Sequence, residues 1–209
     1  MAGELGDIGP RLREERERAG ISQRELARRL GVSASLISQI ESGQSKPSVS
    51  TLYAIVTELG LSLDRVFRAH GAPDPSSGDP GRPSDDPDRD PARPPTPHPV
   101  VRSGQRSVID LASGVRWERL TSHRHEGVDF LYVTYDAGGS SSPDERLMRH
   151  PGREYGFVIS GRLGVQLGFE RHELGPGDAI AFDSTEPHRL WNLGDEPVRG
   201  IWFVVGREG

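Results

Sequence analysis

A short stretch in the first quarter of the chain carries side chains that could hydrogen bond to the edges of DNA bases. Ser35, Ser38 and Gln39 are polar and share one side of a helical pattern, whereas Ile37 and Ile40 occupy the other side. Short hydroxyl groups allow a helix to approach a DNA groove closely, and a glutamine amide pairs well with adenine. The pattern therefore indicates base reading, provided that the neighbouring residues hold this stretch as a helix.

Residues 22–43 contain the signals needed to build that helix and a second one before it. Ser22 is an N-cap residue, and Glu25 lies three positions later, at the capping-box spacing. Gly31 ends the first helix, because glycine tolerates the left-handed backbone of a sharp exit. Ser33 then begins the second helix. The local sequence predicts two short helices joined by a tight turn.

The stretch SQRELARRLGVSASLISQIESG resembles the helix-turn-helix of the phage-repressor-like family of bacterial regulators, the XRE or Cro/C1 type. The resemblance continues through KPSVSTLYAIVTELGLSLDRVF, which corresponds to the fourth and fifth helices of that family, and a first helix is expected over residues 7–19. It implies an N-terminal all-α domain of five helices that binds double-stranded DNA as a sequence-specific transcriptional regulator. A generic helical hairpin, or a protein–protein adaptor without DNA function, is the alternative for this region.

The resemblance and the residue types together indicate which side chains contact the DNA. Arg13, Gln23, Ser45 and Lys46 are expected at the phosphate backbone, where helix N-termini and basic or amide groups bind well. The residues expected to face the groove are Ser33, Ala34, Ser35, Ser38 and Gln39. Because this set contains few strong hydrogen-bonding groups, DNA shape is expected to contribute to the sequence preference.

The composition excludes several classes of protein. The 209 residues include no cysteine, so a disulfide framework and a thiolate metal site are both impossible. The sequence has no apolar run of the roughly 18 residues that a membrane-spanning helix needs, and its charged N-terminus lacks a signal-peptide core. The net charge is −5, but residues 1–70 hold ten basic against nine acidic residues. We therefore expect a cytoplasmic protein without membrane association, with its acidic excess outside the DNA-binding region.

The chain divides by composition into three parts. Residues 71–99 contain ten prolines and no large apolar side chain, which predicts a disordered, flexible linker. At roughly 3.1 Å per residue, such a linker extends up to about 90 Å. We therefore expect a helix-turn-helix domain at residues 1–70 and a second domain at residues 100–209.

The second domain consists of short alternating apolar runs separated by Gly, Pro and Asp, a pattern typical of an antiparallel barrel or sandwich. Two blocks in it resemble the motifs of the cupin family. The first block runs from His150 to Glu154 with Gly161 after it, and the second contains Gly177, His188 and Asn192. The resemblance implies an all-β double-stranded β-helix, or jelly roll, so that the fold class is multidomain α + β.

Cupins often bind a divalent metal through three histidines and one glutamate, and the resemblance carries most of that set over to this chain. His150, Glu154 and His188 occupy three of the four positions, but Met148 stands where the first histidine is usual. Two histidines and a carboxylate hold Fe(II) or a similar metal with open positions. One Fe, Mn, Ni or Zn ion is therefore one interpretation, and a metal-free pocket for a small molecule is the other.

The two resemblances together imply a transcriptional regulator whose cupin domain senses a small-molecule effector. We expect a homodimer joined through its cupin domains, so that two helical domains read two half-sites about 34 Å apart or a multiple of that. We expect no catalytic residues. Non-haem iron enzymes, including an epoxidase family that also joins a helical domain to a cupin, provide the alternative, in which His150, Glu154 and His188 hold the iron.

Other aromatic and histidine residues of the second domain are expected to have structural roles. Tyr155, Phe157, Trp191 and Trp202 are expected to pack inside the barrel, although one of the tryptophans could line an effector pocket. His123 and His125 lie in a polar loop and are more typical of a surface than of a second metal site.

Overall fold

The computed structural model describes residues 8–67, 99–122, 125 and 127–206, so the expected linker lies outside the described residues except for Pro99. The helices are α1 (Gly9–Arg18), α2 (Gln23–Leu30), α3 (Ala34–Glu41), α4 (Val49–Glu58) and α5 (Leu63–Val66). The last of these, α5, is a single turn of four residues. The all-α character predicted for the N-terminal part is confirmed. Within the described residues, no helix is both long and apolar enough to span a membrane.

Serine side chains cap α2, α3 and α4. Ser22 Oγ accepts a hydrogen bond from the Glu25 N–H at 3.1 Å, and Ser33 Oγ accepts one from the Leu36 N–H at 3.1 Å. Gly31 has a φ of +67°, the left-handed geometry that ends α2. Each serine cap contributes about 1 kcal/mol. Local interactions therefore build the tight turn between α2 and α3, as the sequence predicts.

A buried ion pair joins α1 to the C-terminal end of α3. Arg16 Nε and Nη2 donate to the two carboxylate oxygens of Glu41 at 2.6 and 2.9 Å. Their side chains are only 7% and 3% exposed. Gln23 Nε2 also donates to Glu41, at 2.7 Å, and Arg16 Nη1 donates to the Ile21 carbonyl at 2.7 Å. The hydrogen bond to Glu41 raises the pKa of Arg16, and the network fixes α1, α2 and α3 relative to one another.

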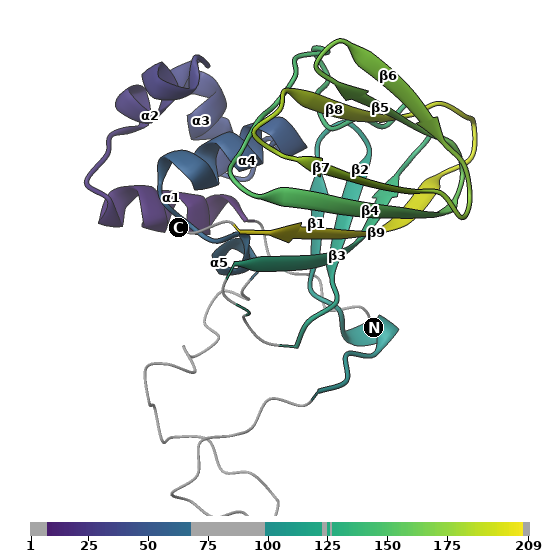
Figure 1. Cartoon of the computed structure of the whole chain (residues 1–209). Helices are drawn as coiled ribbons and strands as arrows, with labels where there is room; N and C mark the ends of the chain where they lie inside the picture. The colour runs from purple at the N-terminus through teal and green to yellow at the C-terminus, as the bar shows by residue number, and fades with distance from the viewer. Residues whose placement is uncertain (1–7, 68–98, 123–124, 126, 207–209) are drawn as a thin grey trace, which may run out of the picture.

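The second part of the chain forms two antiparallel sheets. A 3-10 turn, η1 (Ser103–Gln105), precedes the strands β1 (Val108–Leu111), β2 (Val115–Arg119), β3 (Val128–Tyr135), β4 (Arg153–Ser160), β5 (Leu163–Leu167), β6 (Glu170–Leu174), β7 (Ala179–Asp183), β8 (His188–Asn192) and β9 (Val198–Val205). The larger sheet has the order β1-β2-β3-β9-β4-β7 and the smaller one β6-β5-β8. Figure 1 shows the two sheets facing each other, as expected for a jelly roll.

The strands of the larger sheet alternate between the barrel interior and an outer face. Trp202 lies inside, opposite Gly156 in the adjacent strand, as expected. Tyr155 and Phe157 lie instead on the outer face, 44% and 45% exposed, so the expectation that they pack inside is wrong. The reason is the period of a strand: because Glu154 points inward, its neighbour in the chain must point outward.

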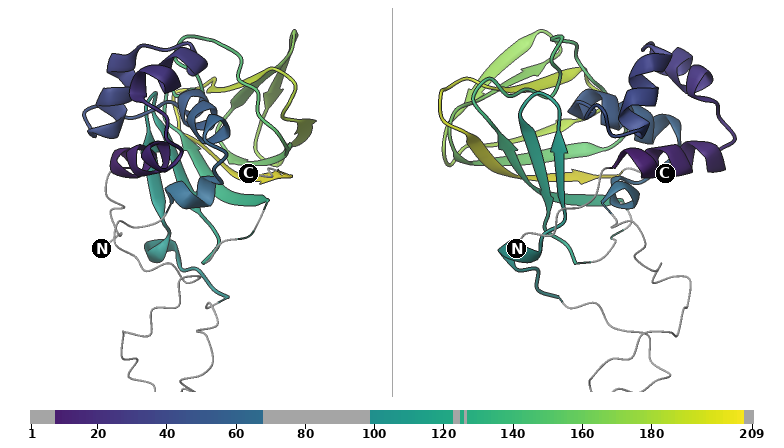
Figure 2. Two further views of the ribbon diagram at one scale, coloured as in Figure 1. Left: turned by 90° about the vertical axis from the view of Figure 1, so that its left-hand side faces the viewer. Right: turned by 180° about the vertical axis from the view of Figure 1, so that it is seen from behind.

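The helix α4 joins the helical part of the chain to one end of the barrel. The Ser50 N–H donates to the Ser141 carbonyl at 3.0 Å, and the Ala112 N–H donates to the Pro47 carbonyl at 2.8 Å. The right-hand view of Figure 2 shows α4 beside the strands, with α2 and α3 on the side of α4 that faces away from the barrel. The helices and the barrel therefore share one continuous buried core.

Candidate DNA-binding surface and metal site

The residues predicted to read the groove lie on the solvent side of α3 and at its N-terminus. The exposed ones are Ser33, Ser35, Ser38 and Gln39, and Ala34 is half-buried. Ile37 and Ile40 anchor the opposite side of α3 in the core, each 1% exposed. The polar side of α3 is thus available to a DNA groove in the arrangement that the structure shows.

The four residues predicted at the phosphate backbone have different surroundings. Arg13 is exposed and donates to Glu17 at 2.8 Å. Gln23 is half-buried and holds Glu41, so its amide also positions α2 against α3. Ser45 is half-buried and Lys46 is exposed. Lys46 Nζ lies 3.8 Å from Asp110 Oδ2 of the barrel.

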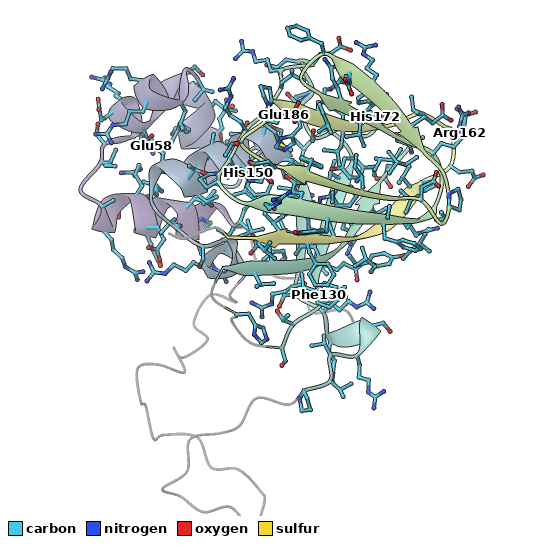
Figure 3. The ribbon with its side chains drawn as sticks, viewed as in Figure 1. Glu58, Phe130, His150, Arg162, His172 and Glu186 are labelled. Carbon is cyan, nitrogen blue, oxygen red and sulfur yellow. The ribbon has the colours of Figure 1, made fainter. Side chains whose placement is uncertain are left out.

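The structure brings His150, Glu154 and His188 together at the end of the barrel that meets the helices. His150 precedes β4, Glu154 lies within β4, and His188 begins β8. Glu154 Oε1 lies 2.9 Å from His150 Nε2 and 3.2 Å from His188 Nε2. The ligand atoms of the three residues all lie within 4.8 Å of one another, and the side chains are 0%, 4% and 0% exposed. In Figure 3, His150 is labelled on the helix-facing side of the barrel.

Hydrogen bonds from the surrounding chain orient each of the three side chains. His188 Nδ1 donates to the Glu186 carbonyl at 2.8 Å, and His150 Nδ1 donates to the Pro151 carbonyl at 3.2 Å. A carbonyl oxygen can only accept, so each Nδ1 is the hydrogen-bond donor, and each Nε2 is turned toward Glu154 Oε1. Trp202 Nε1 donates to Glu154 Oε2 at 2.6 Å. Such outer contacts are typical of metal-binding histidines and carboxylates.

The three potential ligand atoms of this cluster suit a divalent metal ion. His150 Nε2, His188 Nε2 and Glu154 Oε1 are buried, and none has a hydrogen bond within the described residues. Burial by itself would raise the pKa of Glu154, but its contacts with His150 and His188 outweigh burial and hold the pKa well below the usual value. The carboxylate is therefore ionised at neutral pH. Two imidazoles and one carboxylate hold metals such as Fe(II) and leave coordination positions open.

A small cavity adjoins the cluster. Its volume is about 20 Å³, and its lining includes Tyr53, Trp117, Met148, Glu154 and Trp202. That volume is sufficient for one water molecule, which needs at least about 10–15 Å³. Met148, which stands at the usual position of a first histidine, is 9% exposed and pairs with His188 through backbone hydrogen bonds of 2.8 Å.

Two residues at this site have roles that the sequence analysis did not assign. Trp202 packs inside the barrel as expected, and its indole N–H also donates a hydrogen bond to Glu154. Tyr53 of α4 stacks on His150, with ring centroids 4.1 Å apart and an interplanar angle of 14°. Nothing in the local pattern of α4 indicates this contact, since it joins the two parts of the chain. Of the second histidine pair, His125 is exposed and His123 lies outside the described residues.

Comparisons with known proteins support both halves of this description. Residues 12–66 match the helix-turn-helix family, and residues 131–204 match the cupin domain family. The HTH-type transcriptional regulator SutR of Escherichia coli (strain K12) is 35% identical over 187 residues, which cover 90% of this chain and 88% of the relative. The regulator PuuR of the same organism is 27% identical over 186 residues, covering 88% and 86%.

A solved structure shows the same fold over almost the whole chain. It is an HTH_3 family transcriptional regulator from Vibrio cholerae, with a TM-score of 0.63 and 21% sequence identity. The similarity covers 96% of each chain. The combination of the helical part with the barrel is therefore shared between the two proteins.

Proposed function

Since this chain belongs to the family of helix-turn-helix transcriptional regulators with a cupin domain, we propose that its barrel holds one divalent metal ion and senses a small-molecule effector there. The protein is a DNA-binding transcriptional regulator. The observation that supports a bound metal is the cluster of three buried atoms that could coordinate it. None of the three has a hydrogen bond within the described residues. When bound, the metal supplies open positions for oxygen or nitrogen donors of an effector. The similarity to the transcriptional regulators SutR and PuuR supports a regulatory role rather than an enzymatic one.

We propose that α3 reads base edges while Lys46, Ser45, Arg13 and the N-terminus of α2 with Gln23 contact phosphates. Exposure of the polar side of α3 supports this assignment. The ion pair of Arg13 with Glu17 is exposed on both sides, at 61% and 51%, so it opens at little cost when a phosphate approaches. Phosphate contacts set affinity and register, whereas base contacts set the sequence preference.

Two substitutions separate these roles. Gln39→Ala is expected to weaken binding to the specific site by about 1–3 kcal/mol and to relax the preference at one base pair. Lys46→Ala is expected to weaken binding to all duplexes alike and to lower the slope of log K against log salt by about 1 per domain. Fluorescence anisotropy with the upstream DNA of the protein's own gene and a scrambled duplex, at several salt concentrations, measures both effects.

Arg162→Ala is the matched control for this experiment, because Arg162 is an exposed basic residue of the barrel, 59% exposed and paired with Glu173. It is expected to leave DNA binding unchanged. Equal affinity of the wild-type protein for the specific and scrambled duplexes would contradict sequence-specific reading by α3.

We propose that two copies associate through the outer face of the larger sheet. On this aromatic face, side chains of neighbouring strands form two rows across β3, β9 and β4: Phe130, Phe203 and Tyr155, then Tyr132, Ile201 and Phe157. The rings of Phe130 and Phe203 stack with centroids 4.1 Å apart, and Figure 3 shows Phe130 on the outside of the barrel. Contiguous exposed apolar patches mark interfaces. A second copy is the occupant we propose, because helix-turn-helix dimers read two half-sites.

Phe157→Arg is expected to convert the dimer to a monomer at micromolar concentration, because it places an unpaired charge within the aromatic face. Light scattering coupled to size-exclusion chromatography measures the mass. Phe169→Arg provides the control, because Phe169 is fully exposed (105%) between β5 and β6, away from this face. A wild-type monomer, or a Phe157→Arg dimer of wild-type affinity, would be incompatible with this interface.

A further inference from the structure

The helix α4 contributes a side chain to the end of the barrel where the metal cluster lies. The Tyr53 ring stacks on His150 at 4.1 Å, and it meets Trp117 edge-on at 5.4 Å with an interplanar angle of 61°. Tyr53 is only 4% exposed. A residue of the DNA-binding part of the chain therefore covers one of the proposed metal ligands.

The space that remains beneath Tyr53 is too small for an organic molecule. Val49 and Tyr53 of α4 form the helical side of the cavity of about 20 Å³, and Trp117, Met148, Glu154 and Trp202 belong to its barrel side. Pockets for small organic ligands have volumes of about 300–1,000 Å³. An effector that reaches the cluster must therefore occupy space that Tyr53 fills in this structure.

When Tyr53 moves away from the barrel, the other helices must move with it. Leu52 and Val56, on either side of Tyr53 in α4, are fully buried in the helical core, at 0% exposure. The hydrogen bonds from Ser50 of α4 to Ser141, and from Ala112 to Pro47 just before α4, tie this helix and the residues leading into it to the barrel. When α4 withdraws, these two bonds break and α3 moves with α4, because α2 packs against both helices.

We propose that Tyr53 is the removable wall of the effector site, and that the effector is a small molecule whose oxygen donors bind the metal. Binding of this ligand and undocking of the DNA-binding domain are then one event. The inference rests on the proposed function for the metal, whose open positions accept oxygen donors. The role of Tyr53 as a wall follows from the packing around His150 and does not depend on the metal.

The first experiment measures access to the cluster in the metal-free full-length protein. Diethyl pyrocarbonate modifies accessible imidazoles, and peptide mass spectrometry gives the rate at each histidine. In Tyr53→Ala, the rates at His150 and His188 are expected to rise roughly tenfold or more, because the fraction of open molecules increases. Tyr53→Phe keeps the ring and is expected to retain the wild-type rates. His172, whose side chain is 42% exposed, is the internal reference.

The second experiment uses the wild-type protein, so it does not depend on the folding of a variant. Oxalate is added to the zinc-loaded protein, and amide hydrogen exchange is followed by NMR. Exchange at Ser50 and Ala112 is expected to accelerate, whereas the amides of Met148 and His188, which pair within the barrel at 2.8 Å, are expected to stay protected. Oxalate is also expected to bind the zinc-loaded Tyr53→Ala variant more tightly than the wild type.

The outcomes separate this inference from the proposed function. Equal histidine reactivity in all three proteins would overturn the role of Tyr53, and so would oxalate binding without faster exchange at Ser50 and Ala112. Failure of oxalate to bind the zinc-loaded Tyr53→Ala variant would overturn the ligand class. A protein that takes up no zinc, yet shows the tyrosine-dependent reactivity, would contradict the metal of the proposed function and still support Tyr53 as the wall.

Discussion

Arg16→Ala is expected to lower the free energy of unfolding of the helical part by about 3–5 kcal/mol, because it leaves the carboxylate of Glu41 buried without its ionic partner. Glu41 is 3% exposed on its side chain and receives two hydrogen bonds from Arg16, at 2.6 and 2.9 Å. After the substitution, Gln23 is the remaining hydrogen-bond donor to this carboxylate among the described residues, at 2.7 Å, and a neutral amide does not compensate for a guanidinium. Denaturant unfolding followed by circular dichroism measures the change.

Arg13→Ala is the matched control on the same helix. Arg13 also pairs with a glutamate, at 2.8 Å, but its pair is exposed and is expected to contribute less than about 1 kcal/mol. Combining Arg16→Met with Glu41→Leu removes both charges and is expected to recover most of the lost stability. A loss for Arg16→Ala no larger than that for Arg13→Ala would show that burial of the pair is not important. Specific DNA binding should fall together with stability, because the pair holds α1 against α3.

Glu154→Gln and His188→Ala are each expected to reduce bound metal from about one ion per chain to less than about a tenth, because each removes one of three first-coordination ligands. Glu154→Gln keeps the shape of the side chain and the Trp202 hydrogen bond can still form to its carbonyl oxygen, so folding is expected to be retained. Elemental analysis of tag-free protein after reconstitution with Fe(II), Mn(II), Ni(II) or Zn(II) measures the stoichiometry. His172→Ala, at an exposed histidine of the same barrel, is expected to bind metal normally.

Trp202→Phe tests the support of the site rather than its ligands. It removes the N–H that donates to Glu154 Oε2 at 2.6 Å, and removal of such an outer contact weakens metal binding by roughly 10- to 100-fold. The expected order of affinity is therefore wild type, then Trp202→Phe, then the two ligand variants. Less than about a tenth of an equivalent in the reconstituted wild type would instead favour the metal-free pocket.

The helical part was predictable because its signals act over a few residues. The N-cap of Ser22 reaches the N–H of Glu25, and that of Ser33 reaches the N–H of Leu36, so each cap can be identified without knowledge of the rest of the fold. The left-handed Gly31 is equally local. The short α5 shows the limit of this reasoning, since Ser62 stands at its N-cap without a side-chain capping bond.

The candidate site was only partly predictable. The motif blocks indicated His150, Glu154 and His188, and the packing of the smaller sheet, which contains β8, against the larger sheet, which contains β4, brings them together. Aromatic side chains were expected inside the barrel because of their residue type, although alternation from an inward-pointing Glu154 places its neighbours in the strand outside. Tyr155 and Phe157 were therefore assigned to the wrong side.

The sequence by itself determined the helix-turn-helix, the strand-rich second half and the family of each, because these depend on neighbouring residues and on motif spacing. Only the tertiary structure decided that Trp202 holds Glu154, that the aromatic face points to solvent and that Tyr53 covers His150. The physical reason is that these contacts join residues far apart in the chain. They depend on strand register and on the packing of α4 against the barrel, which local patterns do not encode.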